Sequence, residues 1–126
     1  MGLSFSTHHE DYVSAKRSQV IVFHSSSKWK IHFESLKETN KLMVIDFTAS
    51  WCAPCRQIDP GVHDLAVKYT DVEFIKIDVD ELMDVAEEFR VEAMPTFLLI
   101  KKGEVVDKVV GAKKEELQMK IDIHRH

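Results

Sequence analysis

Residues 42–69 read LMVIDFTASWCAPCRQIDPGVHDLAVKY, and the fold follows from this stretch. Its first part, residues 42–48, is largely apolar on both sides of an extended chain, which is typical of a strand buried in a parallel sheet. Its last part predicts a helix of about 17 residues, because apolar side chains recur at helical spacing at Ile58, Val62, Leu65, Ala66 and Tyr69. The stretch is therefore a strand, a short turn with two cysteines and a helix.

Strand and helix patterns alternate along the rest of the chain. Short apolar and β-branched runs predict strands at residues 20–23, 72–77, 96–101 and 104–110. Helical spacing of apolar side chains predicts helices from Ser25 to about Thr39, around residues 82–89, and around Leu117 and Ile121. In the first of these helices, Trp29 shares the apolar spacing and is expected in the core.

The order of the elements indicates the fold class. It is β-α-β-α-β-α-β-β-α, with Lys102-Gly103 as the turn of a closing hairpin. Alternating strands and helices imply right-handed parallel crossovers, and the hairpin adds an antiparallel pair. The sequence therefore predicts an α/β fold, with a central mixed sheet flanked by helices on both faces.

The length and charge of the chain exclude several classes of protein. With 126 residues, it is expected to form one domain, residues 19–126, preceded by a flexible polar extension, residues 1–18. The extension has neither the basic start nor the apolar core of a signal peptide. A net charge of −4 gives no basic surface for nucleic acid. No apolar run approaches the roughly 18 residues that a membrane span needs.

The chain has two cysteines, Cys52 and Cys55, in a C-x-x-C spacing. As a structural disulfide they would close a very small loop and stabilise little. A structural zinc site needs four ligands, and the seven histidines do not supply a second pair at suitable spacing. No metal site is predicted. The remaining interpretation is a reversible redox pair, which suits a reducing compartment.

The position of the cysteines indicates their chemistry. Between a buried strand and a long helix, Cys52 is expected at the helix N-terminus, where free N–H groups and the helix dipole favour a thiolate. The thiolate is the nucleophile of thiol–disulfide exchange. Cys55 lies one turn further on the same helix face, where it can attack a mixed disulfide formed at Cys52. Pro54 is compatible with a first helical turn.

With these residues, the sequence resembles the thioredoxins, and within them the cytosolic h-type thioredoxins of plants. The resemblance covers about residues 19–124. Its matching motifs are residues 44–47, 49–56, 77–80, 91–97 and 110–112. It implies the thioredoxin fold and a thiol–disulfide oxidoreductase that reduces disulfides in target proteins, with Cys52 as the attacking thiolate and Cys55 as the resolving thiol.

The resemblance also implies partners and a docking surface. No cofactor is expected to be bound, because electrons come from NADPH through thioredoxin reductase, or from glutathione and glutaredoxin. Pro95 matches the cis-proline that faces the redox pair in the family. The residues expected to form the flat surface that docks the substrate are Trp51, Ala53, Pro54, Met94, Pro95, Gly111 and Ala112.

Three further residues, Asp46, Ala53 and Lys76, lead to separate expectations. Asp46 lies in the apolar strand, and it is either an edge-strand charge or, as the resemblance implies, a buried carboxyl that transfers protons behind Cys55. Ala53 stands where the family usually has glycine, so a modest change in redox poise and substrate fit is expected. Lys76 alternates with Phe74, and the sequence leaves open whether it reaches solvent or pairs with a carboxylate.

The N-terminus carries a lipidation pattern. Gly2 and Ser6 fit M-G-x-x-x-[ST], which predicts N-myristoylation of Gly2, with a chance match as the alternative. One acyl chain gives marginal, reversible membrane binding, so the expectation is a cytoplasmic monomer that is partly membrane-associated. A thioredoxin-fold chaperone or a membrane-tethered binding adaptor is the alternative function. Both cysteines and Asp46 favour the reductase, because an adaptor does not need them.

Overall fold

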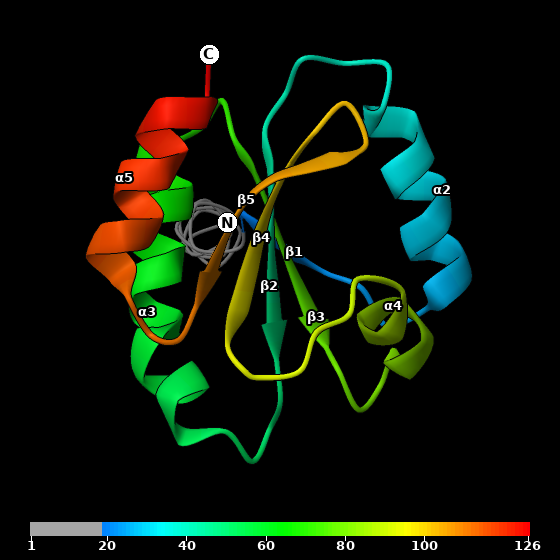
Figure 1. The fold of residues 1–126 in the computed structure, drawn as a ribbon, viewed down its shortest axis with the longest axis vertical. Coiled ribbons are helices and arrows are strands. Elements are labelled where there is room, and N and C mark those ends of the chain that lie inside the picture. Colours follow the sequence, from blue (N-terminus) through cyan, green and yellow to red (C-terminus); the bar gives the residue numbers. More distant parts are fainter. Residues whose placement is uncertain (1–18) are drawn as a thin grey trace, which may run out of the picture.

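The computed structural model describes residues 19–126 of the chain. Within them, a five-stranded mixed sheet lies between two pairs of helices (Figure 1). The strands are β1 (Val20–Val22), β2 (Met43–Thr48), β3 (Glu73–Asp78), β4 (Thr96–Lys101) and β5 (Glu104–Val110), and their order in the sheet is β1-β3-β2-β4-β5. One face is covered by α3 (Ala53–Lys68) and α5 (Lys114–His124), the other by α2 (Ser26–Leu36) and α4 (Met83–Glu88). The predicted fold class is confirmed.

Strand β2 is the centre of the sheet and separates two hydrophobic cores. Because successive side chains of a strand point to opposite faces, Ile45 and Phe47 pack with Trp29 on the side of α2 and α4. Val44 packs on the other side, with side chains of α3 and α5. The same alternation directs Asp46, two residues after Val44, toward α3. The strand pattern therefore decides on which face the carboxyl is buried.

The connection between β3 and β4 differs from the sequence prediction. Strands β1, β3 and β2 are parallel as expected, but β4 runs antiparallel to β2. A parallel crossover must carry the chain back along the sheet, and a six-residue strand is about 20 Å long. Helix α4 has only six residues, about 9 Å at the rise of an α-helix. The chain therefore re-enters the sheet at the end where β3 left it, and β4 must run the opposite way.

The first helix also ends earlier than predicted. Its N-terminus is as expected, because the Ser25 hydroxyl accepts a hydrogen bond from the Lys28 N–H at 3.3 Å. The helix ends at Leu36 instead of Thr39. Both the backbone N–H and the hydroxyl of Thr39 donate to the Leu36 carbonyl, at 3.1 and 3.0 Å. A polar side chain that competes for a backbone carbonyl in this way favours a turn over another helical turn.

The predicted lipidation pattern cannot be placed in the fold. Gly2, Ser6 and the rest of the predicted extension, residues 1–18, lie outside the described residues. Among residues 19–126, no helix combines the length and the apolar character that crossing a bilayer requires.

Candidate active site

Cys52 and Cys55 lie at the junction between the end of β2 and the start of α3. They form a disulfide with a Cα–Cα distance of 5.3 Å. Cys52 is the N-cap residue of α3, and its Sγ accepts a hydrogen bond from the Cys55 N–H at 3.3 Å. The sequence prediction that Cys52 begins the helix is therefore confirmed. Since the first N–H groups of a helix favour a negative charge nearby, this position stabilises a thiolate at Cys52 when the disulfide is reduced.

The loop before β4 packs against the disulfide. The Met94–Pro95 peptide bond is cis, as the resemblance implies. The Met94 carbonyl oxygen lies 3.5 Å from Cys52 Sγ, and the Met94 side chain packs against the buried cysteines. The Pro95 carbonyl accepts a hydrogen bond from the Gly111 N–H at 2.8 Å. Gly111 has a φ of 102°, a conformation that residues with a Cβ rarely adopt. This glycine therefore lets the end of β5 approach the loop.

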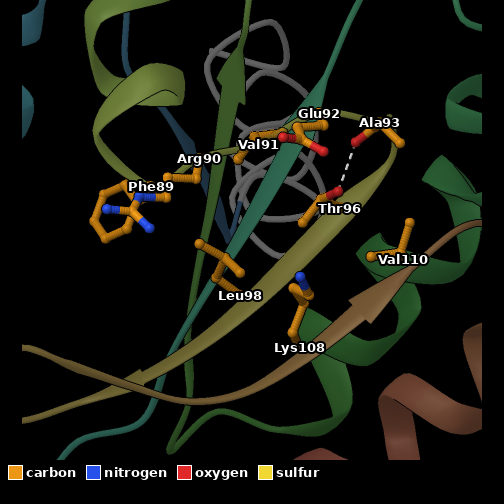
Figure 2. A pocket seen from close by; sticks show the side chains of 9 residues that line it. All are labelled: Phe89, Arg90, Val91, Glu92, Ala93, Thr96, Leu98, Lys108 and Val110. Atoms are coloured by element: carbon orange, nitrogen blue, oxygen red, sulfur yellow. Dashed lines mark hydrogen bonds between the residues drawn. The ribbon is translucent and has the colours of Figure 1, made fainter.

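Figure 2 shows a cleft that is lined in part by Ala93 and Thr96, on either side of Met94 and Pro95 in the chain. The Thr96 hydroxyl donates to the Ala93 carbonyl at 2.5 Å, which closes the loop around Met94 and Pro95. The cleft is lined by Phe89, Arg90, Val91, Glu92, Ala93, Thr96, Leu98, Lys108 and Val110. None of these side chains carries a thiol. The cleft therefore does not contain the redox pair, although Ala93 and Thr96 flank Met94 and Pro95 in the chain.

Trp51 projects beside the disulfide and is held by a carboxylate. Its side chain is 63% exposed, and its indole N–H donates to Asp80 Oδ2 at 2.8 Å. Asp80 is fixed in turn, because its backbone N–H donates to Asp78 Oδ1 at 2.8 Å. The indole presents a large apolar face to solvent while its N–H is satisfied. An aromatic side chain with this combination is suited to protein contacts.

The other residues of the predicted docking surface differ in exposure. Ala53, Pro54 and Ala112 are exposed, Met94 is half-buried and Pro95 is buried. Direct contacts join the two cysteines, Met94, Pro95 and Gly111, as described above. Ala112 follows Gly111 and shares a shallow cleft with Gln57 and Ile58 of α3. The structure thus brings the predicted surface together from the start of α3, the loop before β4 and the end of β5.

Asp46 is buried on the face of β2 that α3 covers. It is 4% exposed, and its Oδ1 atom has no hydrogen-bond partner among residues 19–126. Burial raises the pKa of this carboxyl from its ordinary 3.8 to about 7, although the charge of Lys76 opposes the increase and that of Asp59 adds to it. Because β2 lies between β3 and β4, the interpretation of Asp46 as an edge-strand charge is wrong.

Residues 20–123 match the family model named Thioredoxin. The chain belongs to the thioredoxin family. Among the relatives of this thioredoxin, Thioredoxin H4 from Arabidopsis thaliana is 58% identical over 113 residues, which cover 89% of this chain and 95% of that protein. Thioredoxin H2 from the same plant is 56% identical over 104 residues, 82% of this chain and 78% of that protein.

A solved structure gives the same result in three dimensions. The crystal structure of the thioredoxin NaTrxh from Nicotiana alata matches this thioredoxin with a TM-score of 0.86 and 60% sequence identity. The match covers 86% of this chain and 95% of that chain. The resemblance to h-type thioredoxins of plants is confirmed, and so is the thioredoxin fold. With its cysteines paired at the start of α3, this thioredoxin is a thiol–disulfide oxidoreductase of the protein-disulfide reductase type.

Sequence reasoning missed two acidic residues of this thioredoxin site. Asp80, which holds Trp51, belongs to the matching motif of residues 77–80, but the sequence pattern assigned it no role at the site. A signal was available, because β2 and β3 are parallel and the residues that follow parallel strands meet at one edge of the sheet. The second residue is Asp59 of α3, which pairs with Lys76 and answers the question that the sequence left open.

The arrangement of possible metal ligands can also be compared with the requirements of a metal site. Within residues 19–126, no group of three or more His, Cys, Asp or Glu side chains is arranged to hold a metal ion. The donor sulfurs of the two cysteines are bonded to each other.

Proposed function

We propose that this protein reduces disulfides in other proteins by a dithiol–disulfide cycle in which Cys52 attacks and Cys55 resolves. The observation that carries the proposal is the position of Cys52 as the N-cap of α3, with the disulfide partner one turn further along the helix. The first backbone N–H groups of a helix have no partner within the helix, and at the N-cap position Cys52 lies next to them. The nucleophilic thiolate is therefore assigned to Cys52.

The cycle has two exchange steps. In the first, the Cys52 thiolate attacks one sulfur of a target disulfide, that disulfide breaks, and its other sulfur leaves as a thiolate. In the second, Cys55 loses its proton and attacks Cys52 Sγ, so that the mixed disulfide breaks and the target is released fully reduced. The protein is left with the Cys52–Cys55 disulfide, the form seen in the structure. Two electrons pass to the target in each cycle.

Asp46 is proposed to accept the proton of Cys55. A general base works best when its pKa lies near the working pH. Burial raises the pKa of Asp46 to about 7, so the carboxyl exchanges protons near neutrality. One oxygen of this carboxyl has no hydrogen-bond partner within residues 19–126, so it is available to take up a proton. Its buried position on the face of β2 that α3 covers supports this role, because Cys55 belongs to α3.

The surface around the disulfide is proposed to dock the target. Trp51 supplies an exposed aromatic face next to Cys52 in the chain. The loop with Met94 and Pro95, which contacts Cys52, continues the surface with Gly111 and Ala112. Ala53 and Pro54 are exposed between the two cysteines. Ala53 adds a methyl group to this surface where the family usually has glycine, so we expect it to affect substrate fit and redox poise, with the reaction unchanged.

The proposed electron supply follows from the similarity to h-type thioredoxins. The protein binds no cofactor and receives electrons from NADPH through thioredoxin reductase, with glutathione and glutaredoxin as the alternative donors. We further propose that it acts as a cytoplasmic monomer, and that residues 1–18 are an extension to the thioredoxin domain, residues 19–126.

An insulin-reduction assay tests the proposed function. With NADPH and thioredoxin reductase, the full chain is expected to reduce insulin disulfides, measured as NADPH consumption and as precipitation of the free insulin B chain. A parallel reaction with glutathione and glutaredoxin identifies the donor. If protein that has first been reduced with dithiothreitol fails to reduce insulin, the reductase proposal is wrong and a binding adaptor becomes the better interpretation.

We also propose that Gly2 is N-myristoylated and that this gives transient membrane contact. Coexpression with an N-myristoyltransferase is expected to add one myristoyl group, seen by intact-mass spectrometry. Gly2→Ala removes the acceptor and is expected to abolish both the added mass and the membrane-bound fraction. Leu3→Ala, at a position that the pattern leaves open, is the matched control and keeps both. An unmodified N-terminal glycine in protein from the native source would contradict the proposal.

A further inference from the structure

Lys76 and Asp46 are neighbours in the sheet, but they are not joined by a hydrogen bond. They are register partners on the parallel strands β3 and β2, so their side chains point to the same face, which α3 covers. The Lys76 ammonium instead donates to Asp59 Oδ1, one turn beyond Cys55 on α3. Oδ1 of the buried Asp46 remains without a partner among the described residues. The lysine opposite Asp46 on β3 is thus paired with a different carboxylate.

Other charged and polar groups lie around the ion pair of Lys76 and Asp59. His63, one turn further along α3, has its Nε2 atom 3.6 Å from Asp59 Oδ2. A single cleft of about 360 Å³ is lined by Cys55, Asp59, Lys76, Arg56 and Asp78 together with Thr48, Ala49, Ser50 and Pro60. From β4, the register partner of Asp46 is the apolar Phe97. The resolving cysteine and the ion pair therefore share one solvent-accessible space.

We propose that Asp59 is a positioning residue for the reductase reaction: it holds Lys76 and offsets its charge, so that Asp46 stays free to accept the proton of Cys55. A direct ion pair between Lys76 and Asp46 would occupy the carboxylate and favour its charged form. The ion pair of Lys76 with Asp59 prevents this, because the charge of Asp59 offsets that of Lys76. The inference rests on the proposed proton-transfer role of Asp46.

Electrostatics support this interpretation. The charge of Lys76 lowers the pKa of Asp46, and the charge of Asp59 raises it. Removing the charge of Lys76 therefore raises the proton affinity of Asp46, and removing the charge of Asp59 lowers it. No bond changes at Asp59 itself during the reaction, because the proton passes from Cys55 Sγ to an Asp46 oxygen while Cys55 Sγ attacks Cys52 Sγ. The effect of Asp59 is to set how strongly that oxygen binds the proton.

The test compares three substitutions. Asp59→Asn removes the charge but keeps a side-chain oxygen that can accept a hydrogen bond from Lys76. It is expected to lower the titration midpoint of Asp46 by about half a pH unit or more, since a charge in a partly buried site acts strongly on its neighbours. Lys76→Gln is expected to raise the midpoint. Asp64→Asn makes the same charge change at an exposed residue of α3, beside Lys114, and is the matched control.

Two readouts separate Asp59 from the catalytic role of Asp46. Carbon-13 NMR of the side-chain carboxyls in the oxidised protein, with Asp46→Asn for assignment, gives the Asp46 midpoint without any turnover. The pH profile of insulin reduction gives the midpoint during turnover. A midpoint lower by half a pH unit is expected to raise the ratio of the rate at pH 6 to the rate at pH 8 by up to about threefold in Asp59→Asn.

Each outcome has a defined meaning. An Asp46 midpoint in Asp59→Asn that does not differ from the Asp64→Asn control would overturn the inference, as would a shift of Lys76→Gln in the same direction as Asp59→Asn. If the NMR midpoint moves but the rate profile does not, the proton-transfer role of Asp46 is wrong, and the part of Asp59 in turnover falls with it. If Asp59→Asn does not fold, Lys76→Gln still decides the sign of the coupling.

Discussion

Cys55→Ser is expected to trap target proteins as mixed disulfides at Cys52, whereas Cys52→Ser is expected to trap none and to lose disulfide reduction down to the uncatalysed rate. The reason is the division of roles between the two sulfurs. Without Cys55, the mixed disulfide formed by the Cys52 thiolate has no resolving partner. Without Cys52, the first bond to the target does not form. Non-reducing gels of each variant after incubation with oxidised insulin measure the trapped species.

The Cys52→Ser substitution is expected to remove the nucleophile without destabilising the fold. Cys52 is the N-cap of α3, and a serine hydroxyl can accept the same backbone N–H. The Cys52→Ser variant is therefore expected to unfold at nearly the same urea concentration as reduced wild-type protein. The double variant Cys52→Ser/Cys55→Ser controls for non-specific association. Trapping by Cys52→Ser together with its absence in Cys55→Ser would reverse the assignment of attacking and resolving cysteine.

Asp46→Asn is expected to slow turnover and to stabilise the fold, and both effects depend on pH. The folded pKa of Asp46 is about 7 and its ordinary value is 3.8. Below the lower value the carboxyl is protonated in both the folded and the unfolded chain, so burial carries no ionisation cost. As pH rises toward 7 the unfolded chain ionises first, and the folded state becomes less stable by an amount that levels off above pH 7 at about 4 kcal/mol.

The asparagine side chain is neutral at every pH and avoids this cost. We expect urea unfolding of the oxidised protein to show a stabilisation of about 1–4 kcal/mol for Asp46→Asn at pH 8, and a much smaller difference at pH 4. Insulin reduction at pH 7 is expected to fall by about tenfold or more, since general-base catalysis contributes about 10²–10⁴ in rate. An unchanged rate would remove Asp46 from the mechanism. A less stable variant would mean that the carboxyl is needed for structure.

The position of Cys52 was predictable from the sequence, because Cys52 lies where the strand pattern stops and the helical spacing begins. This conclusion depends on local periodicity, which is the strongest signal that a sequence carries. The burial of Asp46 was predicted only through the resemblance, because the residues alone left an edge-strand position open. In the structure, side chains alternate along β2, so Asp46 lies on the same face as Val44, in a strand with neighbours on both sides.

The partners of the polar side chains were not predictable in the same way. Lys76 and Asp59 are 17 residues apart, and Trp51 and Asp80 are 29 apart. Each pair forms because the sheet brings different elements together, and several acidic residues along the sequence were equally plausible partners. The direction of β4 was missed for a related reason. It depends on the true length of α4, and helix boundaries are less well defined by periodicity than the existence of a helix.

The cap at the start of α3 links the stability of a helix to the reducing power of the whole protein. Cys52 Sγ accepts the Cys55 N–H, and a sulfur that becomes a thiolate is a stronger acceptor than one in a disulfide. In a thermodynamic cycle, any free energy by which the helix end favours the reduced state also makes that state a weaker electron donor. For this two-electron couple, about 1.4 kcal/mol of such stabilisation raises the reduction potential by about 30 mV. Substitutions that strengthen the N-terminal end of α3 for the thiolate therefore make the protein a poorer reductant, even when they touch no substrate.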